Sequence, residues 1–344
     1  MTVFWLKKAM VKLTFEHPSP IDKPGTPDTK DRLVCVTVCT LKRPQMLEKC
    51  LNSIAGQIVP DGWQFCLVVV ENTPDNASEK IALKVKAQTG VDLTYMNEPN
   101  RGIPQARNRA MAQALMLNAD WIAFIDDDET AEPGWLAAYC TAADQYDAQI
   151  LRGPVNLAYP PQTPDWYPKL SKPVEETGSS EVMFSTSNLM ISQHLISPLG
   201  YGLKFNEDMR FTGGSDWEFC SKAVKCGAKA ITVSNAVVID EVVGNRITLK
   251  WLLQRQTRIS ANKSWGRIKR LGRFLSVIII VAQAVMKSLT GFLTLIFAAL
   301  LLPFSVTRAK YWASKAIISF AAAFGYLLPI FGILPQPYRE VDGY

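Results

Sequence analysis

Histidine is nearly absent from this sequence, which has only His17 and His194. A Ser/His/Asp triad or a His-ligated metal needs histidine beside its partners, and His17 lies in a proline-rich N-terminal stretch. Both kinds of site are therefore hard to assemble. The 7 cysteines contain no CxxC pair. We expect reduced, buried thiols in a cytoplasmic domain, and neither a disulfide framework nor a zinc site.

A cofactor signature and a targeting signature are also missing. No GxGxxG follows the first apolar run, at residues 33–39, so a ligand other than NAD is expected. Residues 1–12 hold lysines inside a short apolar run and no small-residue cleavage site, which argues against a secretory signal. Residues 1–31 are predicted to be a loose leader because prolines are frequent in them.

Acidic residues are missing between Val242 and Lys315, where we count 13 Lys or Arg and no Asp or Glu. The chain has 37 basic and 31 acidic residues in all, so the remainder is acidic. Such an asymmetry favours a polyanionic surface as a partner. Because the basic segment alternates with long apolar runs, a membrane fits it better than a nucleic acid does.

The sequence does contain an alternation of apolar strands and helices. Strands are predicted at 33–39, 65–70, 91–96 and 121–125, and helices at 45–57, 77–89 and 103–118. This order predicts an α/β fold with a mostly parallel sheet flanked by helices. Ligands of such sheets bind beyond the carboxyl ends of the strands, where Thr40, Glu71, Asn97 and Asp126 fall.

A run of acids, Asp126 to Glu129, directly follows the fourth strand. Carboxylates this close repel one another unless a cation compensates them, and hard oxygen ligands suit Mg²⁺ or Mn²⁺. A divalent metal is the first hypothesis, and an acidic turn exposed to water is the alternative. In an extended segment alternate residues point the same way, so Asp128 is expected to matter more for the metal than Asp127.

Another acid, Asp216, follows Gly213-Gly214-Ser215 at the start of a helix predicted to reach about Cys226. The glycines let the backbone approach a ligand closely, and a carboxylate there can take the proton of an attacking hydroxyl. Capping of the helix by Ser215 or Asp216 is the simpler alternative. Residues 150–212 are rich in proline and are expected to be irregular, with residues 185–188 on a short strand or loop.

Residues 248–273 are predicted to form a basic amphipathic helix, with Trp251 and Trp265 suited to a membrane interface. Residues 274–304 and 316–335 are apolar runs long enough to cross a bilayer, although Lys287 and several prolines leave spanning, re-entrant and interfacial arrangements open. The predicted organisation is a leader (1–31), a catalytic domain (32–245) and a membrane-associating region (246–344).

Taken together, the motifs resemble the family 2 glycosyltransferases with a GT-A fold, and in detail the succinoglycan-type exopolysaccharide glucosyltransferases. The resemblance covers about residues 33–258. Its motifs are VTVCT at 36–40 with Arg43-Pro44, VVEN at 69–72, Gly102 with ARN at 106–108, FIDDDE at 124–129 and GGSDWE at 213–218.

The resemblance implies that Thr40 and Glu71 contact the nucleoside, with Glu71 where the family usually has Asp. Asp126 would face the ribose, Asp128 would face a metal on the diphosphate, and Asp216 would be the catalytic base. Ser215 stands where the family usually has Glu before that base. The predicted donor site comprises Thr40, Arg43, Glu71, Arg107, Asp126, Asp127, Arg255 and Arg258, and the predicted Mg or Mn site comprises Asp126 and Asp128.

The predicted reaction follows from these roles. One base, with no second carboxylate as nucleophile, implies inversion, and the QRQTR at 254–258 lacks the QxxRW of processive members, which favours addition of one sugar. The expected donor is a UDP-hexose. The expected acceptor is a lipid-linked saccharide, on a polyprenyl diphosphate, at the cytoplasmic face of the cell inner membrane. The product would serve exopolysaccharide or other surface-polysaccharide biosynthesis.

Two other readings are weighed against this one. The run from Asp126 to Thr130 also fits the DxDxT of haloacid-dehalogenase-like phosphatases, but that motif normally begins its domain, whereas here about 90 residues of βαβ pattern precede it. A non-catalytic membrane scaffold that kept the fold is the other reading. Release of UDP or of inorganic phosphate would separate the three.

Overall fold

The structure is a computed structural model that describes residues 31–169, 175–180 and 184–336. The predicted leader falls almost entirely outside the described residues. All seven cysteines are described and free, and five are buried as expected, whereas Cys39 is partly buried and Cys226 is exposed. Exposure of Cys226 departs from the expectation of buried thiols, because this residue directly follows the last turn of a surface helix.

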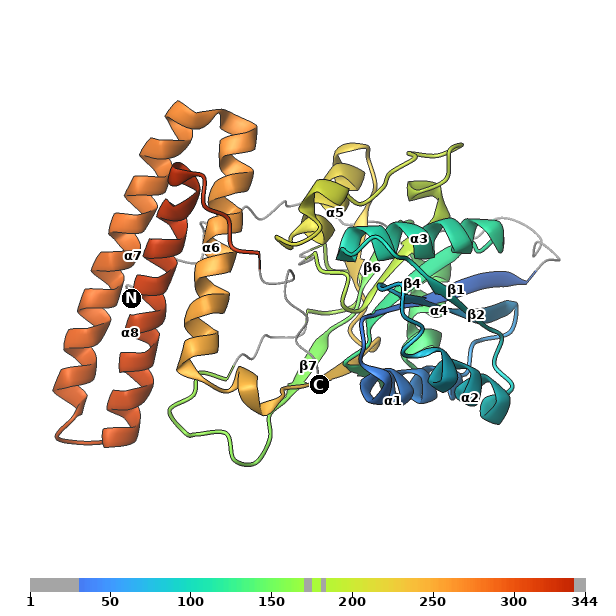
Figure 1. The fold of residues 1–344 in the computed structure, drawn as a ribbon, viewed down its shortest axis with the longest axis horizontal. Helices are drawn as coiled ribbons and strands as arrows, with labels where there is room; N and C mark the ends of the chain where they lie inside the picture. Colours follow the sequence, from blue (N-terminus) through green and yellow to red (C-terminus); the bar gives the residue numbers. More distant parts are fainter. Residues whose placement is uncertain (1–30, 170–174, 181–183, 337–344) are drawn as a thin grey trace.

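A seven-stranded sheet forms the body of the protein, in the order β3-β2-β1-β4-β8-β6-β9 (Figure 1). Strands β1, β2, β3 and β4 are mutually parallel, whereas β8 runs antiparallel to both β4 and β6. The strands are β1 (Arg32–Thr40), β2 (Trp63–Glu71), β3 (Leu93–Asn97), β4 (Trp121–Asp126), β6 (Ile150–Arg152), β8 (Leu189–Ser192) and β9 (Ala230–Thr232).

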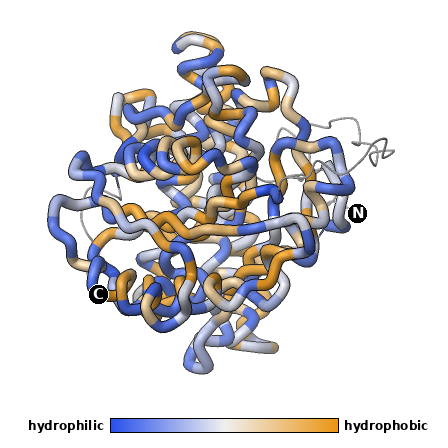
Figure 2. The backbone as a smooth tube through the Cα atoms, turned by 90° about the vertical axis from the view of Figure 1, so that its right-hand side faces the viewer, coloured by the Kyte–Doolittle hydropathy of each residue, from blue (hydrophilic) through white to orange (hydrophobic). Residues whose placement is uncertain are grey.

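Helices cover both faces of this sheet because each strand is apolar on both sides. One core lies under α1 (Pro44–Ala55), α2 (Glu79–Thr89) and α4 (Trp135–Gln145). The other lies under α3 (Ile103–Met116) and α5 (Ser215–Lys225). Figure 2 shows the apolar strands running between these layers. The predicted α/β architecture with a mostly parallel sheet is confirmed.

A small second sheet extends from the edge where the strands of the body end. Its order is β5 (Glu129–Ala131), β10 (Val238–Glu241) and β7 (Val155–Ala158). Strand β10 pairs antiparallel with β5 and parallel with β7. Because β5 follows the acidic run directly, β10 is brought beside the acids. A short helix, η4 (Gly244–Arg246), then leads into the C-terminal helices.

Three long helices end the described chain: α6 (Leu249–Leu271), α7 (Arg273–Leu301) and α8 (Val306–Leu327), the last continued by η5 (Leu328–Phe331). Helix α6 lies between the catalytic body and the α7–α8 hairpin (Figure 1). Helices α6 and α8 approach closely, because a Cβ added at Gly325 would lie 2.3 Å from the carbonyl oxygen of Thr257. Small residues at such contacts let helix backbones pack tightly.

Two of the described helical segments, Arg273–Leu301 and Val306–Phe331, are long and apolar enough to cross a membrane. Many large apolar side chains on them are exposed, including Phe274 at 80% and Phe331 at 74%. Exposed apolar surface of this extent marks a membrane or partner contact. Trp251 is partly buried against a cluster that includes Tyr167 and Leu252, so it packs in part on protein.

Candidate active site

A cavity of about 130 Å³ opens at the carboxyl edge of the main sheet. Its lining comprises Ile103, Arg107, Asp126, Ser185, Thr186, Met209, Arg210, Gly213, Gly214, Ser215 and Asp216. Ligand pockets are commonly about 300 to 1,000 Å³, so this cavity can hold a part of a nucleotide sugar, such as its sugar ring. The two predicted acids Asp126 and Asp216 thus face one space from different elements.

Asp216 lies in the first turn of α5, and the N-cap residue of this helix is Gly214 with a φ of 90°. Because the N-cap residue is a glycine, neither Ser215 nor Asp216 occupies the capping position, although the Asp216 side chain still bonds to an N–H of the first turn. The Asp216 Oδ1 accepts a hydrogen bond from the Trp217 N–H at 2.9 Å. The left-handed glycine conformation turns the chain sharply and brings the carboxylate to the cavity.

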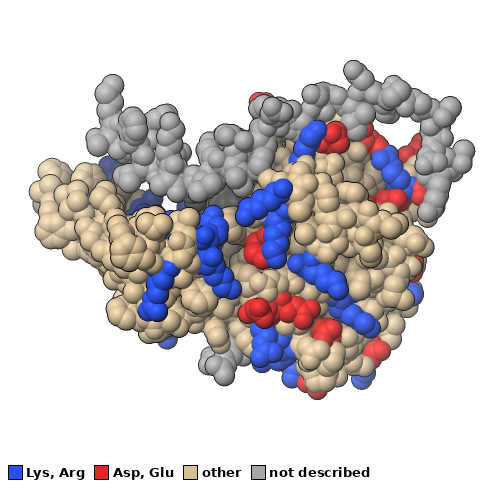
Figure 3. All heavy atoms as spheres, turned by 90° about the horizontal axis from the view of Figure 1, so that it is seen from above, with Lys and Arg blue, Asp and Glu red and all other residues tan. Residues whose placement is uncertain are grey.

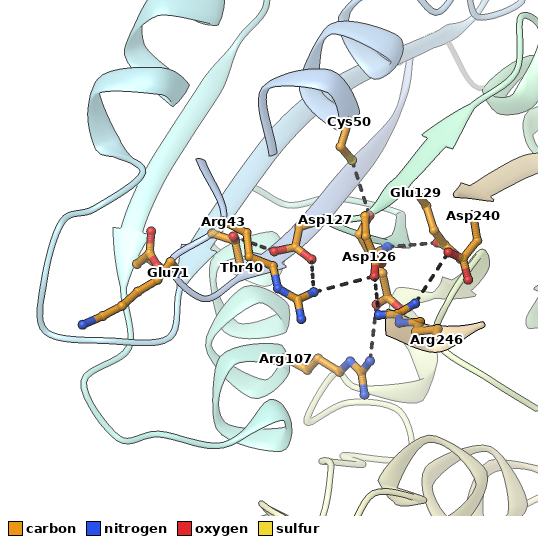
Figure 4. A network of polar contacts seen from close by, with 12 residues as sticks. Thr40, Arg43, Cys50, Glu71, Arg107, Asp126, Asp127, Glu129, Asp240 and Arg246 are labelled. Carbon is orange, nitrogen blue, oxygen red and sulfur yellow. Dashed lines mark hydrogen bonds and ion pairs between the residues drawn. The ribbon is translucent and has the colours of Figure 1, made fainter. Parts of the chain in front are cut away.

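Asp127 points away from this cavity and into the body of the protein (Figure 4). Its Oδ2 accepts a hydrogen bond from the Thr40 hydroxyl at 2.7 Å, and its Oδ1 accepts one from Arg43 Nη1 at 3.3 Å. Thr40 and Arg43 are therefore linked to the acidic run before any donor binds. Asp127 thus contacts Thr40 and Arg43, whereas Asp126 contacts Arg107.

The expectation that Asp128 points with Asp126 into one space is not met in the cavity, whose lining contains Asp126 without Asp128. Residues 127 and 128 form a turn between β4 and β5, so the two-residue alternation of an extended strand does not apply to them. Asp128 Oδ2 instead lies 3.0 Å from Arg246 Nη2 and 3.6 Å from Arg43 Nη1.

Arg246 is a site residue that sequence reasoning assigned to the membrane region. It joins Asp128 to Asp240 of β10, because its Nη1 also lies 3.8 Å from Asp240 Oδ1 (Figure 4). The position of the basic residue beside the acidic pair could not be inferred from spacing. A signal was present in the chain nonetheless, since Arg246 is the first basic residue after Asp240 and Glu241, the last acids before the basic segment.

Burial raises the pKa of several acids in this cluster. It raises the pKa of Asp127 to about 7, with Asp128 adding to the effect and Arg43 opposing it. It raises the pKa of Asp240 to about 6, with repulsion by Asp128 next. The pKa values of Asp126 and Glu129 are also raised, first by removal from bulk water. Perturbed carboxylates gathered in a cleft are typical of functional sites.

Within the described ranges, no group of three or more His, Cys, Asp or Glu side chains is placed to hold a metal by itself. Magnesium and similar ions are commonly held by one or two carboxylates together with substrate phosphates. The donor set fits that mode, because Asp126 and Asp128 are hard oxygen donors and the ion pairs of Asp128 in the described part of the chain are with guanidinium groups. The residues present therefore fit a divalent ion that binds together with a diphosphate.

Glu71 lies in a different setting from the other predicted donor residues. It is fully buried, and its Oε1 accepts the Lys42 N–H at 2.8 Å while its Oε2 accepts the Ser78 N–H at 3.1 Å. The carboxylate thus holds the loops after β1 and β2 together. The side chain is one methylene longer than the Asp usual in the resembling family, which lets it reach these amides. A nucleoside contact by Glu71 would require these bonds to open.

Besides Arg43, the three other predicted donor-site arginines fall in two places. Arg107 of α3 lines the cavity, and its Nη2 lies 3.6 Å from Asp126 Oδ1. Arg255 and Arg258 lie on α6, outside the cavity lining. Arg255 stacks over Trp251 at 5.6 Å and is close enough to Asp240 to lower its pKa slightly.

Thr186 is a cavity residue that the sequence did not single out by itself. Its side chain is 1% exposed, and its hydroxyl has no hydrogen-bond partner among the described residues. The loop is fixed next to it by Asn188, which has a φ of 57° and a fully buried side chain. Asn188 accepts from Trp135 Nε1 at 2.7 Å and donates to the Ala236 carbonyl at 2.7 Å. The cavity lining therefore includes a residue whose buried hydroxyl has no partner among the described residues.

The sequence of this chain is similar to a known protein family and to a known bacterial protein. Residues 35–201 match the family described as glycosyl transferase family 2. The succinoglycan biosynthesis protein ExoM of Rhizobium meliloti (strain 1021) is 28% identical over 238 residues, which are 68% of this chain and 74% of that protein.

Two solved structures are similar in fold. Mannosyltransferase PcManGT from Pyrobaculum calidifontis, in complex with GDP-Man and Mn²⁺, has a TM-score of 0.56 at 18% identity, with 89% of this chain and 90% of that chain covered. S. aureus TarS 1-349 in complex with UDP has a TM-score of 0.51 at 16% identity, with 85% and 90% covered. This chain spans 39% of a longer TarS chain.

A mostly parallel sheet flanked by helices, with acids and guanidinium groups at its carboxyl edge, defines a GT-A type α/β protein. Residues 35–201 of this chain form a glycosyl transferase family 2 domain with that fold. The phosphatase reading of residues 126–130 is therefore wrong, and the physical reason is topological, because the acids follow the fourth strand of the chain and not the first.

Proposed function

We propose that this protein is an inverting glycosyltransferase that adds a single hexose from a UDP-sugar to a lipid-linked saccharide. The observation that carries the proposal is the shared cavity of Asp126 and Asp216, flanked by Arg107 and Arg210. One carboxylate and the guanidinium groups lie at the donor side, where the acidic run ends β4. The other carboxylate enters from α5 and has no second acid of α5 beside it in the lining.

In this reaction Asp216 takes the proton of the acceptor hydroxyl as that hydroxyl attacks the anomeric carbon. A carboxylate within reach of the hydroxyl is suited to this task. The nucleoside diphosphate leaves from the opposite face of the sugar, so the anomeric configuration inverts. Arg43 and Arg107 lie at the acidic run, where they can bind the phosphates and stabilise the charge of the leaving group.

A divalent metal, Mg²⁺ or Mn²⁺, would be held at Asp128 with Asp126 and would neutralise charge on the diphosphate. PcManGT is described with Mn²⁺ and TarS with UDP, which supports a metal and a nucleotide-sugar donor for this chain. Thr40, through its bond to Asp127, would position the nucleoside side of the donor. Arg255 and Arg258 on α6 are proposed to complete the donor site from the other side.

The proposed acceptor is a saccharide on a polyprenyl diphosphate at the cytoplasmic face of the cell inner membrane. The two apolar helices and their exposed side chains support a membrane location. The similarity to a succinoglycan biosynthesis protein supports exopolysaccharide or other surface-polysaccharide biosynthesis as the context. Addition of one hexose, and no processive synthesis, agrees with the absent QxxRW motif.

A screen of nucleotide sugars tests this function. Purified full-length protein is incubated with each UDP-hexose, a polyprenyl diphosphate saccharide and Mn²⁺ or Mg²⁺, and UDP release is measured with and without chelator. We expect acceptor-dependent and metal-dependent UDP release, and a product whose anomeric configuration by NMR is opposite to that of the donor. A retained configuration would refute inversion, and no release with any nucleotide sugar would favour the scaffold reading.

A further inference from the structure

Four cations gather where α6 meets α7, away from the carboxylates of the cavity. Lys263, Arg267 and Arg270 are spaced four and three residues apart on α6, so they lie on one side of that helix. Lys287 joins them from α7, because Arg267 contacts Gln283, which lies one helical turn before Lys287 on that helix. Burial lowers the pKa of Lys263, and repulsion by Lys287 and Arg267 lowers it further.

The cluster has no anionic partner in the described part of the chain. No ion pair joins a carboxylate to any of the four, and the segment from Val242 to Lys315 contains no acid at all. Arg267 is held by a neutral amide, its Nη1 donating to Gln283 Oε1 at 2.6 Å. Lys287 lies at the middle of a 29-residue apolar helix. A charge in such a place is costly and calls for a counter-ion.

The cluster is connected to the active site through α5 and its preceding loop. Arg270 lies over the ring of Trp217 at 5.6 Å, and Trp217 is the residue after Asp216. One residue before Lys263, Asn262 Nδ2 donates to the Thr212 carbonyl at 2.8 Å, next to the glycines of the cavity. Figure 3 shows Lys and Arg side chains gathered where the apolar helices meet the catalytic body.

We propose that Lys263, Arg267 and Lys287 form a binding site for the diphosphate of a lipid-linked acceptor. Arg270 continues the site toward the cavity. The proposal rests on the proposed function and names the residues that would hold its acceptor. The apolar face of α7 beside the cluster would take the polyprenyl chain, and the saccharide would extend past Trp217 toward Asp216.

Charge and position favour a diphosphate over a single phosphate. Three cations that repel one another offer the charge that two linked phosphates carry, and Lys and Arg are the usual ligands of phosphate oxygens. The position of Lys287 in an apolar helix favours an anion that is attached to a lipid. An anionic glycerophospholipid is also a membrane lipid but carries a single phosphate, so it provides the comparison in the test.

The experiment measures binding to full-length protein in neutral detergent micelles. A polyprenyl diphosphate and phosphatidylglycerol are the two probes, and tryptophan fluorescence is the signal because Trp217 stacks on Arg270. We expect the wild type to bind the polyprenyl diphosphate more tightly. The double variant Lys263→Gln/Lys287→Gln should bind it about 10-fold more weakly or worse. The matched control, Lys250→Gln/Lys310→Gln, removes two exposed cations elsewhere and should bind like the wild type.

A charge-preserving variant and a stability measurement separate loss of the site from loss of the fold. The variant Lys263→Arg/Lys287→Arg preserves the charge and should retain binding. The Gln variant should unfold at an unchanged or higher temperature, because it removes repulsion among cations. Equal binding of the diphosphate by wild type and the Gln variant, or equal binding of the two probes by the wild type, would overturn the site.

The outcome can be separated from that of the proposed function. Neither Lys263 nor Lys287 lines the cavity, so UDP-sugar binding should be the same in all these variants. If the protein binds no nucleotide sugar yet loses diphosphate binding in the Gln variant, the site stands and the proposed transfer reaction fails. If nucleotide sugars bind and diphosphate binding does not depend on the cluster, the proposed transfer reaction stands and the diphosphate site fails.

Discussion

The carboxylates of Asp126 and Asp216 line one cavity, although they come from the end of a central strand and the first turn of a helix near the C-terminal region. The glycines before Asp216 make this meeting possible, since both adopt positive φ. If Asp216 removes the acceptor proton, Asp216→Asn should keep UDP-sugar binding and lower kcat by about 100-fold or more.

The control for this variant is Asp208→Asn, which neutralises an exposed acid of the neighbouring η3 (Glu207–Met209). It should transfer at the wild-type rate. Isothermal titration with the UDP-sugar and initial rates on the lipid-linked acceptor are the two measurements. An Asp216→Asn protein that transfers sugar normally would leave this residue with only a structural part at the start of α5.

The two acids of the turn, Asp127 and Asp128, are expected to differ in their importance for sugar transfer. Asp128→Asn should abolish transfer, because it removes the carboxylate proposed for the metal and now paired with Arg246. Asp127→Asn should keep most of the activity, because an amide oxygen can still accept the Thr40 hydroxyl. Rates are compared at saturating Mn²⁺ and donor. Equal losses in the two proteins would show that the assignment of these acids is wrong.

Thr186 should affect substrate binding and not folding. In Thr186→Val the unpaired buried hydroxyl is replaced by a methyl group of similar size, so thermal stability should be unchanged or higher. We expect kcat/KM for the UDP-sugar to fall about 10-fold, as when one hydrogen bond to a substrate hydroxyl is lost. Thr186→Ser should restore it. A Val variant with wild-type kinetics would mean that the hydroxyl contacts no substrate.

The close contact of α6 and α8 predicts opposite effects of one substitution at two glycines. Gly325→Ala should lower the unfolding temperature, since its Cβ would meet the Thr257 carbonyl at 2.3 Å. Gly266→Ala, on α6 with nothing within 4 Å, should raise it, because Ala favours a helix by up to about 1 kcal/mol over Gly. Thermal unfolding in detergent measures both, and a stabilised Gly325→Ala would disprove the tight helix contact.

Asp240 makes stability depend on pH in a defined direction. Its pKa is raised by burial to about 6, from about 3.9 in an unfolded chain, so the folded state favours the neutral acid. The stability from this group is present below pH 4 and is lost as pH rises to about 6. In Asp240→Asn the decline in unfolding temperature over this range should be smaller. An unchanged pH profile would show that Asp240 titrates normally.

The strands of the first half could be predicted because they are apolar on both faces, as in β1, whose residues Val34 to Val38 are nearly all fully buried. The short strands β6, β8 and β9, of 3, 4 and 3 residues, could not, since so few residues carry no periodic pattern and prolines surround two of them. Strand β8 pairs antiparallel with β4 and β6, and β9 pairs parallel with β6, so these pairings arise from contacts between distant segments.

The site was predictable where one local motif carries it and not where the fold assembles it. Asp126 and Asp216 follow recognisable local patterns, and both lie at the cavity. The contact of Arg246 with Asp128 joins residues 118 positions apart, so no spacing rule could reveal it. The burial of Glu71 depends on which amides its longer side chain can reach, and that also follows only from the packed loops.

Arg246 lies three residues before the start of α6, and this short connection limits how far the acidic cluster can lie from that helix. A chain of three residues spans at most about 11 Å, so the acid that Arg246 contacts stays near the first turn of that helix. The acidic edge of the sheet is thus held beside the C-terminal helices. If the acceptor is lipid-linked, as proposed, one whose growing end lies many sugars from its lipid would have to fold back to be extended.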